Sequence, residues 1–178
     1  MYQQEVWQEY DLAGTPLQNG GRTRVDAATT PGSLTGVANI WLYRKTPAGI
    51  ELLFQQRSSL VSHYAGKFDV SAGGHINYGE TALSAAIREA EEEIGIKVTP
   101  SQLKFLMTFV SDSSFRHIFA ADWTEQPHEF NFNDAEVSKV EWVPLAKIDA
   151  FCQQYVKLPL ARDVTQFSFL TRWLKNHA

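Results

Sequence analysis

Four charged side chains lie close together near the middle of the chain: Arg88, Glu89, Glu92 and Glu93. The three glutamates have the spacing i, i+3 and i+4, which places their carboxylates on one side of an α-helix. Like charges at that spacing repel one another unless a cation lies between them, and Lys97 is the only basic residue that closely follows them. Because hard divalent cations take oxygen ligands, this pattern predicts a metal site.

The helix that carries these glutamates is predicted for residues 80–94. Steps of 100° per residue gather an apolar stripe that should face the core. The stripe comprises Leu83, Ile87, Ala90 and Ile94. Ala82 and Ala86 fall beside the stripe, so we expect them to leave open space next to the carboxylates. Glu80 suits the positive end of the helix dipole, Gly95 suits a left-handed C-cap, and Glu91 should be solvated.

Glutamate runs on helices are more often solvated faces than sites, so the identity of this segment depends on its whole pattern. From Gly74 to Ile96 the sequence reads GHINYGETALSAAIREAEEEIGI. The positions that define the pattern are Gly74, Glu80, Arg88, Glu89, Ala90, Glu92, Glu93, Gly95 and Ile96. In residue type and spacing the segment resembles the Nudix box at each defined position.

The resemblance implies an α/β fold, namely a Nudix-type α/β/α sandwich with a mixed β-sheet. It implies hydrolysis of a diphosphate linkage, most often in a nucleoside diphosphate joined to another group. The implied cofactor is Mg²⁺ or Mn²⁺, which would neutralise the diphosphate and activate water. Its implied ligands are the carboxylates of Glu89, Glu92 and Glu93 and the backbone carbonyl of Gly73.

The resemblance also implies that Arg88 orients the catalytic glutamate, with Glu80 as the supporting partner of the arginine. Glu92 lies four residues after Arg88, so the two could equally form a plain helix ion pair. Gly74 and Gly95 would support the turns at the two ends of the box.

A second, weaker resemblance lies outside the box. The stretch QQRSSLVSHYAGKFDVSAGGH and the opening segment that ends in DLAGTP resemble the branch related to isopentenyl-diphosphate isomerase, so the likeness covers residues from about 5 to 145. Isomerase activity is therefore one alternative function. That enzyme needs a cysteine and a histidine-rich metal site, whereas Cys152 lies well after the box and TTPGSLTGVANIWLY contains no histidine. A further alternative is a nucleotide-sensing module without catalysis, but such modules commonly have a degraded box, and this box is whole.

The composition limits the class of protein. The 178 residues are 44% hydrophobic, which is enough for one core, so residues 1–178 are expected to form a single Nudix domain. The net charge of −4 disfavours nucleic-acid polymers and anionic membranes as partners, and favours a small phosphorylated substrate. One cysteine and the lack of a signal-peptide pattern or an apolar run of transmembrane length predict a cytoplasmic protein.

Apolar runs separated by turn residues predict the secondary structure around the box. We expect strands at residues 5–11, 37–43, 50–56, 104–110, 115–121 and 137–142. Pro47 and Gly49 indicate a hairpin between the second and third of these strands. Residues 21–35 are expected to form a loop. One helix should follow Pro144, and another should run from about Asp163, as N-cap, to Asn176. Interspersed strands and helices favour a layered α/β domain.

Two basic residues are candidates for substrate binding. Arg57 and Lys67 lie between the second predicted hairpin strand and the box, where either could reach a substrate phosphate, although solvation is at least as common for Lys67. His75 follows the glycine pair and is expected to hydrogen-bond backbone rather than bind metal. His63 and Tyr64, in a predicted loop, are weaker candidates for contact with a base or sugar, and His117, in a predicted strand beside Arg116, is a further weak candidate for the site. Candidates for an additional general base are Asp112, Glu129, Asp134 and Glu136, among which the sequence does not choose.

Most aromatic residues are expected to pack rather than bind substrate. The residues predicted to lie in the core are Trp41, Trp123, Trp142 and Phe68. In the C-terminal helix, apolar residues recur at helical spacing and should pack on the domain or against a second subunit. These are Phe167, Leu170, Trp173 and Leu174. A homodimer is therefore one expected assembly.

Overall fold

The computed structural model describes residues 5–29, 34–111, 113–127, 129–132, 135–155 and 164–177. Its central strand is β4 (Leu34–Thr46), in which every residue from Leu34 to Tyr43 is buried. A strand covered on both faces reads as a nearly continuous apolar run rather than an alternation, which is the pattern of this segment. The strand therefore needs helices on both sides of the sheet.

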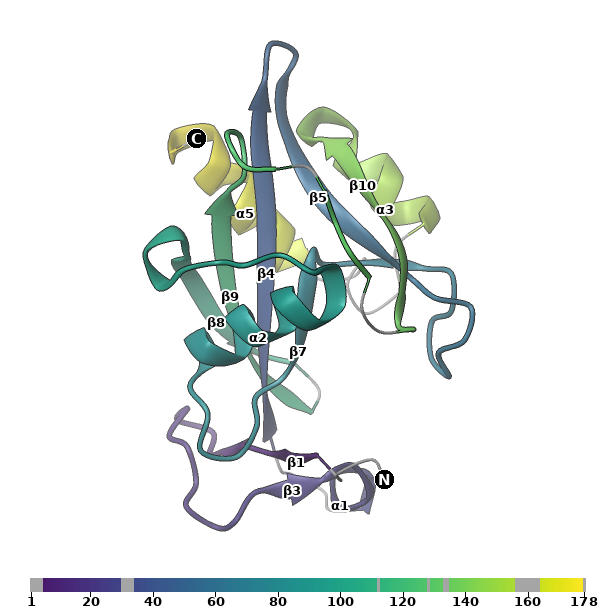
Figure 1. The fold of residues 1–178 in the computed structure, drawn as a ribbon. Coiled ribbons are helices and arrows are strands. Elements are labelled where there is room, and N and C mark those ends of the chain that lie inside the picture. Colours follow the sequence, from purple (N-terminus) through teal and green to yellow (C-terminus); the bar gives the residue numbers. More distant parts are fainter. Residues whose placement is uncertain are drawn as a thin grey trace.

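The main sheet has the strand order β10-β5-β4-β9-β8 (Figure 1). Its longer strands are β5 (Gly49–Arg57), β8 (Lys104–Val110), β9 (Ser114–Asp122) and β10 (Val137–Pro144). β4 and β9 run parallel and the other neighbours run antiparallel, so the sheet is mixed, as expected. The short strands β2 (Glu9–Tyr10) and β7 (Ala72–His75) pair with β4, and β6 (Phe68–Asp69) pairs with β5.

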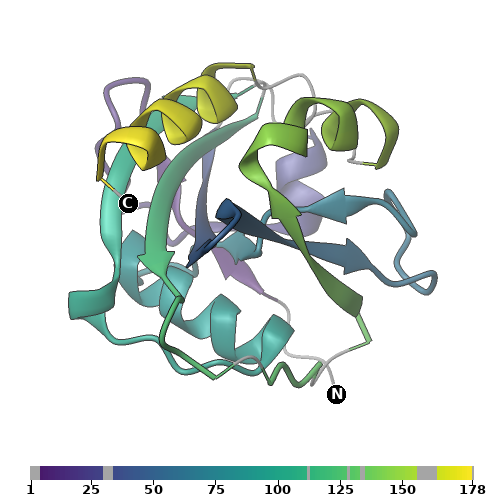
Figure 2. The ribbon, with the colours of Figure 1, turned by 90° about the horizontal axis from the view of Figure 1, so that it is seen from above.

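Helices cover both faces of the sheet (Figure 2). Helix α2 (Ala82–Ile94) lies on one face, while α3 (Ile148–Tyr155) and α5 (Val164–His177) lie on the other. Each face has its own apolar cluster, with Ala38 and Ile40 among the residues under α2 and Trp41 and Phe54 among those under α3 and α5. The α/β/α architecture is thus confirmed. The remaining elements are β1 (Val6–Trp7), β3 (Arg22–Thr23), α1 (Arg24–Thr29) and two short 3₁₀ turns, η1 (Pro100–Gln102) and η2 (Leu145–Lys147).

Helix α2 begins and ends at residues whose chemistry explains its limits. Thr81 is the N-cap and forms a capping box with Ser84, in which each side chain bonds the backbone N–H of the other. Gly95 ends the helix at φ +70°, and its N–H bonds backbone carbonyls of the last turn. The predicted range of 80–94 is therefore correct to within two residues.

The buried face of α2 differs from the prediction in one respect. Ala85, Ala86 and Ala90 are fully buried against the sheet, whereas Leu83 and Ile87 are only partly buried. The expectation that Ala86 leaves open space beside the carboxylates is wrong, because the small alanines allow the helix to approach the sheet closely. This close approach also buries Glu93, which is 5% exposed.

Replacing Gly95 by alanine should lower the free energy of unfolding by about 2–3 kcal/mol, because an L-residue is strained at positive φ and the new Cβ overpacks its surroundings. That Cβ would lie 2.7 Å from Cβ of Asn131 and also collide with the Asn131 backbone. Gly66→Ala is the matched control, since Gly66 has φ +72° and nothing within 4 Å of the added atom. Urea denaturation of both variants checks the prediction, and equal losses would contradict it.

Other predicted elements agree with the structure to different degrees. The strands from β4 onward and the C-terminal helix are confirmed, but residues 5–11 form two short strands that pair with different partners. The expected loop at 21–35 contains β3, α1 and the start of β4. β6 and β7 were missed, because two to four residues are too few to show a period. Asp163, the predicted N-cap, lies outside the described residues.

The aromatic and C-terminal predictions concern packing. Trp41, Trp123 and Phe68 are buried as expected, whereas Trp142 is only partly buried and has Arg44 4.5 Å from its ring centre. In α5 the buried residues are Phe167, Leu170 and Leu174, which pack on the sheet. The alternative in which this face meets a second subunit is therefore not needed to explain its apolar character. Within the described chain, no helix combines the length and the apolar character that a membrane span requires.

Candidate active site

The glycine turn before the box lies against helix α2. A Cβ at Gly74 would lie 2.6 Å from the carboxylate carbon of Glu89, so a side chain at this position would displace the Glu89 carboxylate. This contact gives the predicted supporting role of Gly74 a physical reason. The turn and the helix together bring backbone and carboxylate groups into one small region.

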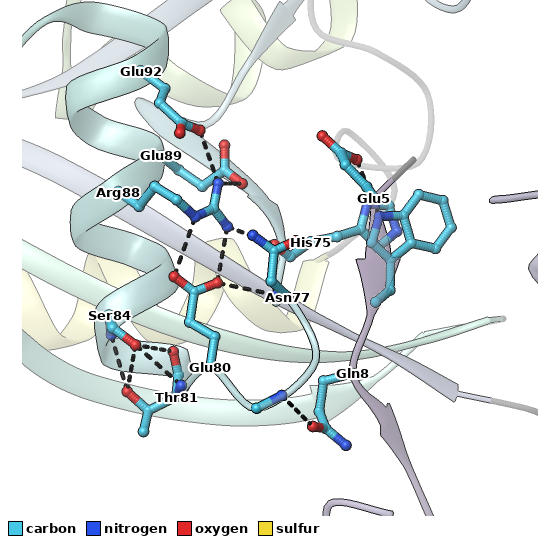
Figure 3. Close-up of polar contacts among 12 residues, drawn as sticks. Glu5, Gln8, His75, Asn77, Glu80, Thr81, Ser84, Arg88, Glu89 and Glu92 are labelled. Carbon is cyan, nitrogen blue, oxygen red and sulfur yellow. Dashed lines mark hydrogen bonds and ion pairs between the residues drawn. The ribbon is translucent and has the colours of Figure 1, made fainter. Parts of the chain in front are cut away.

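The guanidinium of Arg88 donates hydrogen bonds to several groups in this region (Figure 3). Its Nε and Nη2 donate to the two carboxylate oxygens of Glu80 at 3.1 and 3.0 Å, and Nη2 also donates to the carbonyl oxygen of His75 at 2.9 Å. Its Nη1 donates to Glu89 Oε1 and Glu92 Oε2, both at 2.8 Å. The guanidinium therefore contacts three carboxylates at once.

These contacts correct the premise that Lys97 is the only basic residue available to the glutamates. Lys97 is exposed and lies 4.0 Å from Glu91, whereas Arg88 itself lies between Glu80, Glu89 and Glu92. Burial lowers the pKa of Arg88, but the three carboxylates more than offset it, so its pKa is above the usual value. The helix ion pair with Glu92 exists, and it is one part of a larger network.

Glu93 has a different environment. Its Oε2 accepts hydrogen bonds from Gln55 Nε2 at 3.0 Å and from the Gly73 N–H at 2.8 Å. Burial and then the charge of Glu89 raise the pKa of Glu93 well above its usual value. Within the described chain, no cationic side chain pairs with Glu93. Gly73 meets this carboxylate through its N–H, and the expected role of its carbonyl as a metal ligand stays a prediction.

The carboxylates of Glu89 and Glu92 are more exposed to solvent than that of Glu93. Burial raises the pKa of Glu89 to about 7, against the opposing charge of Arg88. The side chain of Glu92 is 55% exposed and is held by Arg88 alone among the contacts described. The helix thus presents one buried, one partly buried and one exposed carboxylate.

A divalent cation requires several oxygen ligands close together. In the described part of the chain, no three His, Cys, Asp or Glu side chains are placed so that they could hold a metal ion. Arg88 donates hydrogen bonds to the carboxylates of Glu89 and Glu92. Two features nevertheless fit a cation: Glu93 is a buried carboxylate without a cationic partner, and Oε1 of Gln55 is buried without a hydrogen-bond partner. Carboxylate and amide oxygens are ligands that Mg²⁺ and Mn²⁺ accept.

Gln55 is a site residue that sequence reasoning missed. It is 1% exposed on β5 and contacts Glu93 directly. The available signal was a glutamine inside the apolar run ELLFQQ, where a buried polar side chain needs a partner. Asp69, buried on β6 and paired in register with Gln55, also raises the pKa of Glu93 through its charge.

Of the two predicted substrate-binding residues, Arg57 is the last residue of β5, and Lys67 directly precedes β6. Arg57 is two residues after Gln55 and so belongs to the same face of the strand. Its Nε donates to the carbonyl oxygen of His63 at 3.1 Å, and its backbone N–H donates to the carbonyl oxygen of Lys67 at 2.9 Å. Lys67 is exposed. The structure therefore brings Arg57 and Lys67 together, and their contact with substrate remains a prediction.

The weaker candidates are dispersed. Tyr64 is 46% exposed at φ +54°, in the loop that also contains His63. His117 lies in β9, where its Nδ1 is 3.1 Å from the Thr108 hydroxyl and burial lowers the pKa of the ring. Glu129 and Glu136 are exposed, and Asp112 and Asp134 lie outside the described residues.

His75 links the glycine turn to the N-terminal strands. Its carbonyl accepts from Arg88, and its ring stacks on Trp7 with 3.7 Å between ring centroids. Burial lowers the pKa of His75 from 6.5 to about 4. The ring is therefore neutral at physiological pH, and this neutrality depends on its packing.

His75→Phe should remove part of the acid sensitivity of folding. A histidine whose pKa is lowered by folding stabilises the protein above its unfolded pKa of 6.5, and that contribution is lost as pH falls through about 4. For wild type, the free energy of unfolding lost in this way is at most about 3 kcal/mol. Phenylalanine keeps the stack on Trp7 and has no ring that titrates. Urea midpoints measured across this range should fall less steeply for the variant. An unchanged slope, equal to that of the exposed control His63→Gln, would contradict this expectation.

Comparison with known proteins identifies the family. A model of the NUDIX domain matches residues 34–164, so the chain belongs to the Nudix hydrolase family. Nudix hydrolase 3 of Arabidopsis thaliana is 30% identical over 118 residues, which cover 60% of this chain. The chain spans only 15% of the length of that plant protein. The narrower resemblance to isomerase-related proteins stays a prediction.

Two solved structures have the same fold. DR0079 from Deinococcus radiodurans superposes with a TM-score of 0.70 at 24% identity, over 96% of this chain and 99% of that one. The NUDIX domain of Shewanella oneidensis NrtR, solved with ADP ribose, has a TM-score of 0.61 at 18% identity, over 78% of this chain and 87% of that one. At these identities the likeness concerns the fold.

Proposed function

We propose that this protein is a Mg²⁺- or Mn²⁺-dependent hydrolase that cleaves a diphosphate linkage in a small phosphorylated metabolite. The substrate class is a nucleoside diphosphate joined to another group. The observation that carries the proposal is the buried carboxylate of Glu93, which has no cationic partner in the described chain and lies on the box helix with Glu89 and Arg88. Membership in the Nudix family supports it, and the ADP ribose bound to a structural neighbour supports the substrate class.

The proposed metal ligands are Glu89, Glu92 and Glu93, with the Gly73 carbonyl. When bound, a divalent cation supplies neutralisation of the diphosphate charge and Lewis acidity. Because Arg88 holds Glu89 and Glu92 at 2.8 Å in this structure, the two carboxylates must share their oxygens between the guanidinium and the cation. The double hydrogen bond of Arg88 to Glu80 keeps the guanidinium in place during this exchange.

A proton acceptor is also needed when water attacks phosphorus. Among the described residues, Glu129 and Glu136 remain the candidates for this role. Arg57 and Lys67 are the proposed phosphate ligands. A hollow of about 440 Å³ lies along α2 beside Arg88 and Glu92, where a substrate could enter.

The alternatives receive less support from the structure. Cys152 lies in α3, on the opposite face of the sheet from the box helix, and burial raises the pKa of its thiol to about 12. This position does not suit a catalytic cysteine of an isomerase. We also propose that the protein acts in the cytoplasm on a small molecule, and not on a nucleic-acid polymer or a membrane. A homodimer stays a prediction.

The test is a substrate panel with products resolved by mass. The protein is incubated with Mg²⁺ or Mn²⁺ and with nucleotide sugars, dinucleotides, nucleoside di- and triphosphates, or isopentenyl diphosphate. Cleavage of a diphosphate bond in one nucleotide class is expected. Tight binding without cleavage of any compound would favour a sensor, and double-bond migration without cleavage would favour the isomerase; either would overturn the proposal.

A further inference from the structure

The N-terminal strands lie against the loop that leads into helix α2. We call residues 6–10, which include β1 and β2, the N-terminal arm, and residues 76–80 the box loop. The arm precedes the segment that matches the Nudix family, which begins at residue 34. Figure 3 shows Gln8 of the arm next to the box loop, on the side opposite the carboxylates of α2. Backbone and side-chain hydrogen bonds join the two segments.

Backbone hydrogen bonds connect the arm to both the box loop and the central strand. The N–H of Gln8 donates to the carbonyl oxygen of Ile76 at 2.7 Å, and the N–H of Tyr78 donates to the carbonyl oxygen of Val6 at 2.8 Å. The carbonyl oxygen of Gln8 accepts from the N–H of Gly36 on β4 at 2.8 Å. The arm therefore ties the box loop to the most deeply buried strand of the sheet.

Two side chains of the arm add specific contacts. Oε1 of Gln8 accepts from the N–H of Gly79 at 3.1 Å, while its Nε2 donates to the carbonyl oxygens of Glu9 and Leu17. Gln8 is 2% exposed, so its side chain is buried, and its bond to Glu9 is shielded from water. Trp7 is 5% exposed, and its ring stacks on His75, the residue that precedes the box loop.

Hydrogen bonds within the box loop connect the arm to Arg88 on helix α2. The N–H of Glu80 donates to the carbonyl oxygen of Asn77 at 2.8 Å, and Oε2 of Glu80 accepts from the Asn77 N–H at 3.0 Å. Glu80 and the His75 carbonyl then hold Arg88 from the two ends of the loop. Arg88 in turn orients the carboxylates of Glu89 and Glu92.

We propose that the N-terminal arm is a positioning element of the active site, in which Gln8 and Trp7 hold the box loop so that Glu80 keeps Arg88 aligned. The inference rests on the proposed function, because alignment matters only if Arg88 and its carboxylates perform chemistry. Neither arm residue touches the carboxylates, so both are positioning residues. Small misplacements of catalytic groups lower kcat more than substrate affinity.

The experiment uses the whole chain with the variants Gln8→Met and Trp7→Leu. Gln8→Met removes the acceptor for Gly79 without a large change in volume, and Trp7→Leu removes the stack on His75. Trp7→Phe is the conservative rescue because it restores an aromatic ring. Val6→Thr is the matched control, since the Val6 side chain is 37% exposed and the variant keeps the backbone carbonyl that accepts from the Tyr78 N–H. Each variant is assayed well below its own melting temperature.

Three readouts separate positioning from a merely structural role. We expect Gln8→Met and Trp7→Leu each to lower kcat by about ten-fold with KM unchanged, and to weaken Mn²⁺ binding measured by electron paramagnetic resonance. Trp7→Phe and Val6→Thr should behave like wild type. Amide exchange at Glu80, whose N–H has no contact with the arm, should become faster in Gln8→Met. A lower melting temperature with wild-type kcat, Mn²⁺ affinity and Glu80 exchange would overturn the inference.

The two possible failures can be distinguished. If wild type neither cleaves the substrate panel nor binds Mn²⁺, the proposed function fails, and the positioning role in catalysis fails with it. If wild type is active but Glu80 exchange and kcat are unaffected in both variants, only the arm inference fails. Exchange at Glu80 needs neither metal nor substrate, so this readout is obtained in both cases.

Discussion

Replacement of Glu93 by glutamine should lower kcat by about 10³-fold, because removing this proposed metal ligand would forfeit roughly 4 kcal/mol of charge stabilisation in the transition state. Glutamine keeps the size of the side chain and can still accept from the Gly73 N–H. The change therefore removes the charge with little disturbance of packing. Steady-state kinetics at saturating Mg²⁺ on the substrate found in the panel measures this loss.

The same variant should be at least as stable as wild type when metal is absent. Folding raises the pKa of Glu93 above 4.5, so its stabilising contribution is present below that pH and is lost as pH rises through the higher, folded-state pKa. At neutral pH the wild-type protein has lost part of this stabilising contribution. The amide of Glu93→Gln is neutral at every pH, so the variant does not lose stability in this way. An inactive variant with an unchanged or raised melting temperature would exclude misfolding as the cause of lost activity.

The matched control is Glu91→Gln on the same helix. Glu91 is exposed and forms an ion pair with Lys97 at 4.0 Å, whereas Arg88 pairs with Glu80, Glu89 and Glu92. We expect wild-type kcat and stability for this variant. Equal activity of Glu93→Gln and Glu91→Gln would contradict the role assigned to Glu93.

Replacement of Arg88 by methionine should have the second largest effect, with kcat lower by about 10²-fold or more because the carboxylates lose their alignment. The change leaves Glu80, Glu89 and Glu92 without their shared cation. We expect a loss of about 2 kcal/mol in the free energy of unfolding, less than for a fully buried pair because the Arg88 side chain is 26% exposed. Kinetics and urea denaturation measure the two effects.

Two further variants separate charge from geometry at this position. Arg88→Lys keeps the charge, but a lysine cannot contact Glu80, Glu92 and the His75 carbonyl simultaneously, so activity should stay low. The double variant Glu80→Gln, Arg88→Met should recover stability relative to Arg88→Met, because it removes one of the unpaired carboxylates. Full activity of Arg88→Lys would show that the hydrogen-bond network of Arg88 is not required.

The box was readable from sequence because its chemistry is local. A helix converts the spacing of Glu89, Glu92 and Glu93 into a common direction, and glycines mark both ends of the segment. The longer strands were predicted for the same reason, since β4 and β5 have enough residues to show continuous apolar runs. The C-terminal helix was predicted from the spacing of its apolar residues.

What the sequence did not reveal depends on contacts between distant segments. Gln55 contacts Glu93 across 38 positions, and Gln8 contacts Gly79 across 71. No local period reports such pairs, because each residue alone reads as an ordinary polar side chain. The Arg88 network was predicted only in part. The resemblance implied the contact with Glu80, whereas the bond to the His75 carbonyl depends on how the box loop folds back.

The measurement that tests the central claim most directly is Mn²⁺ binding to the metal-free protein, followed by electron paramagnetic resonance. The account predicts saturable binding to wild type and to Glu91→Gln, and binding weakened by about ten-fold or more in Glu93→Gln. Equal Mn²⁺ affinity in Glu93→Gln and wild type, or no binding to wild type, would contradict the claim that the carboxylates of α2 hold a divalent cation.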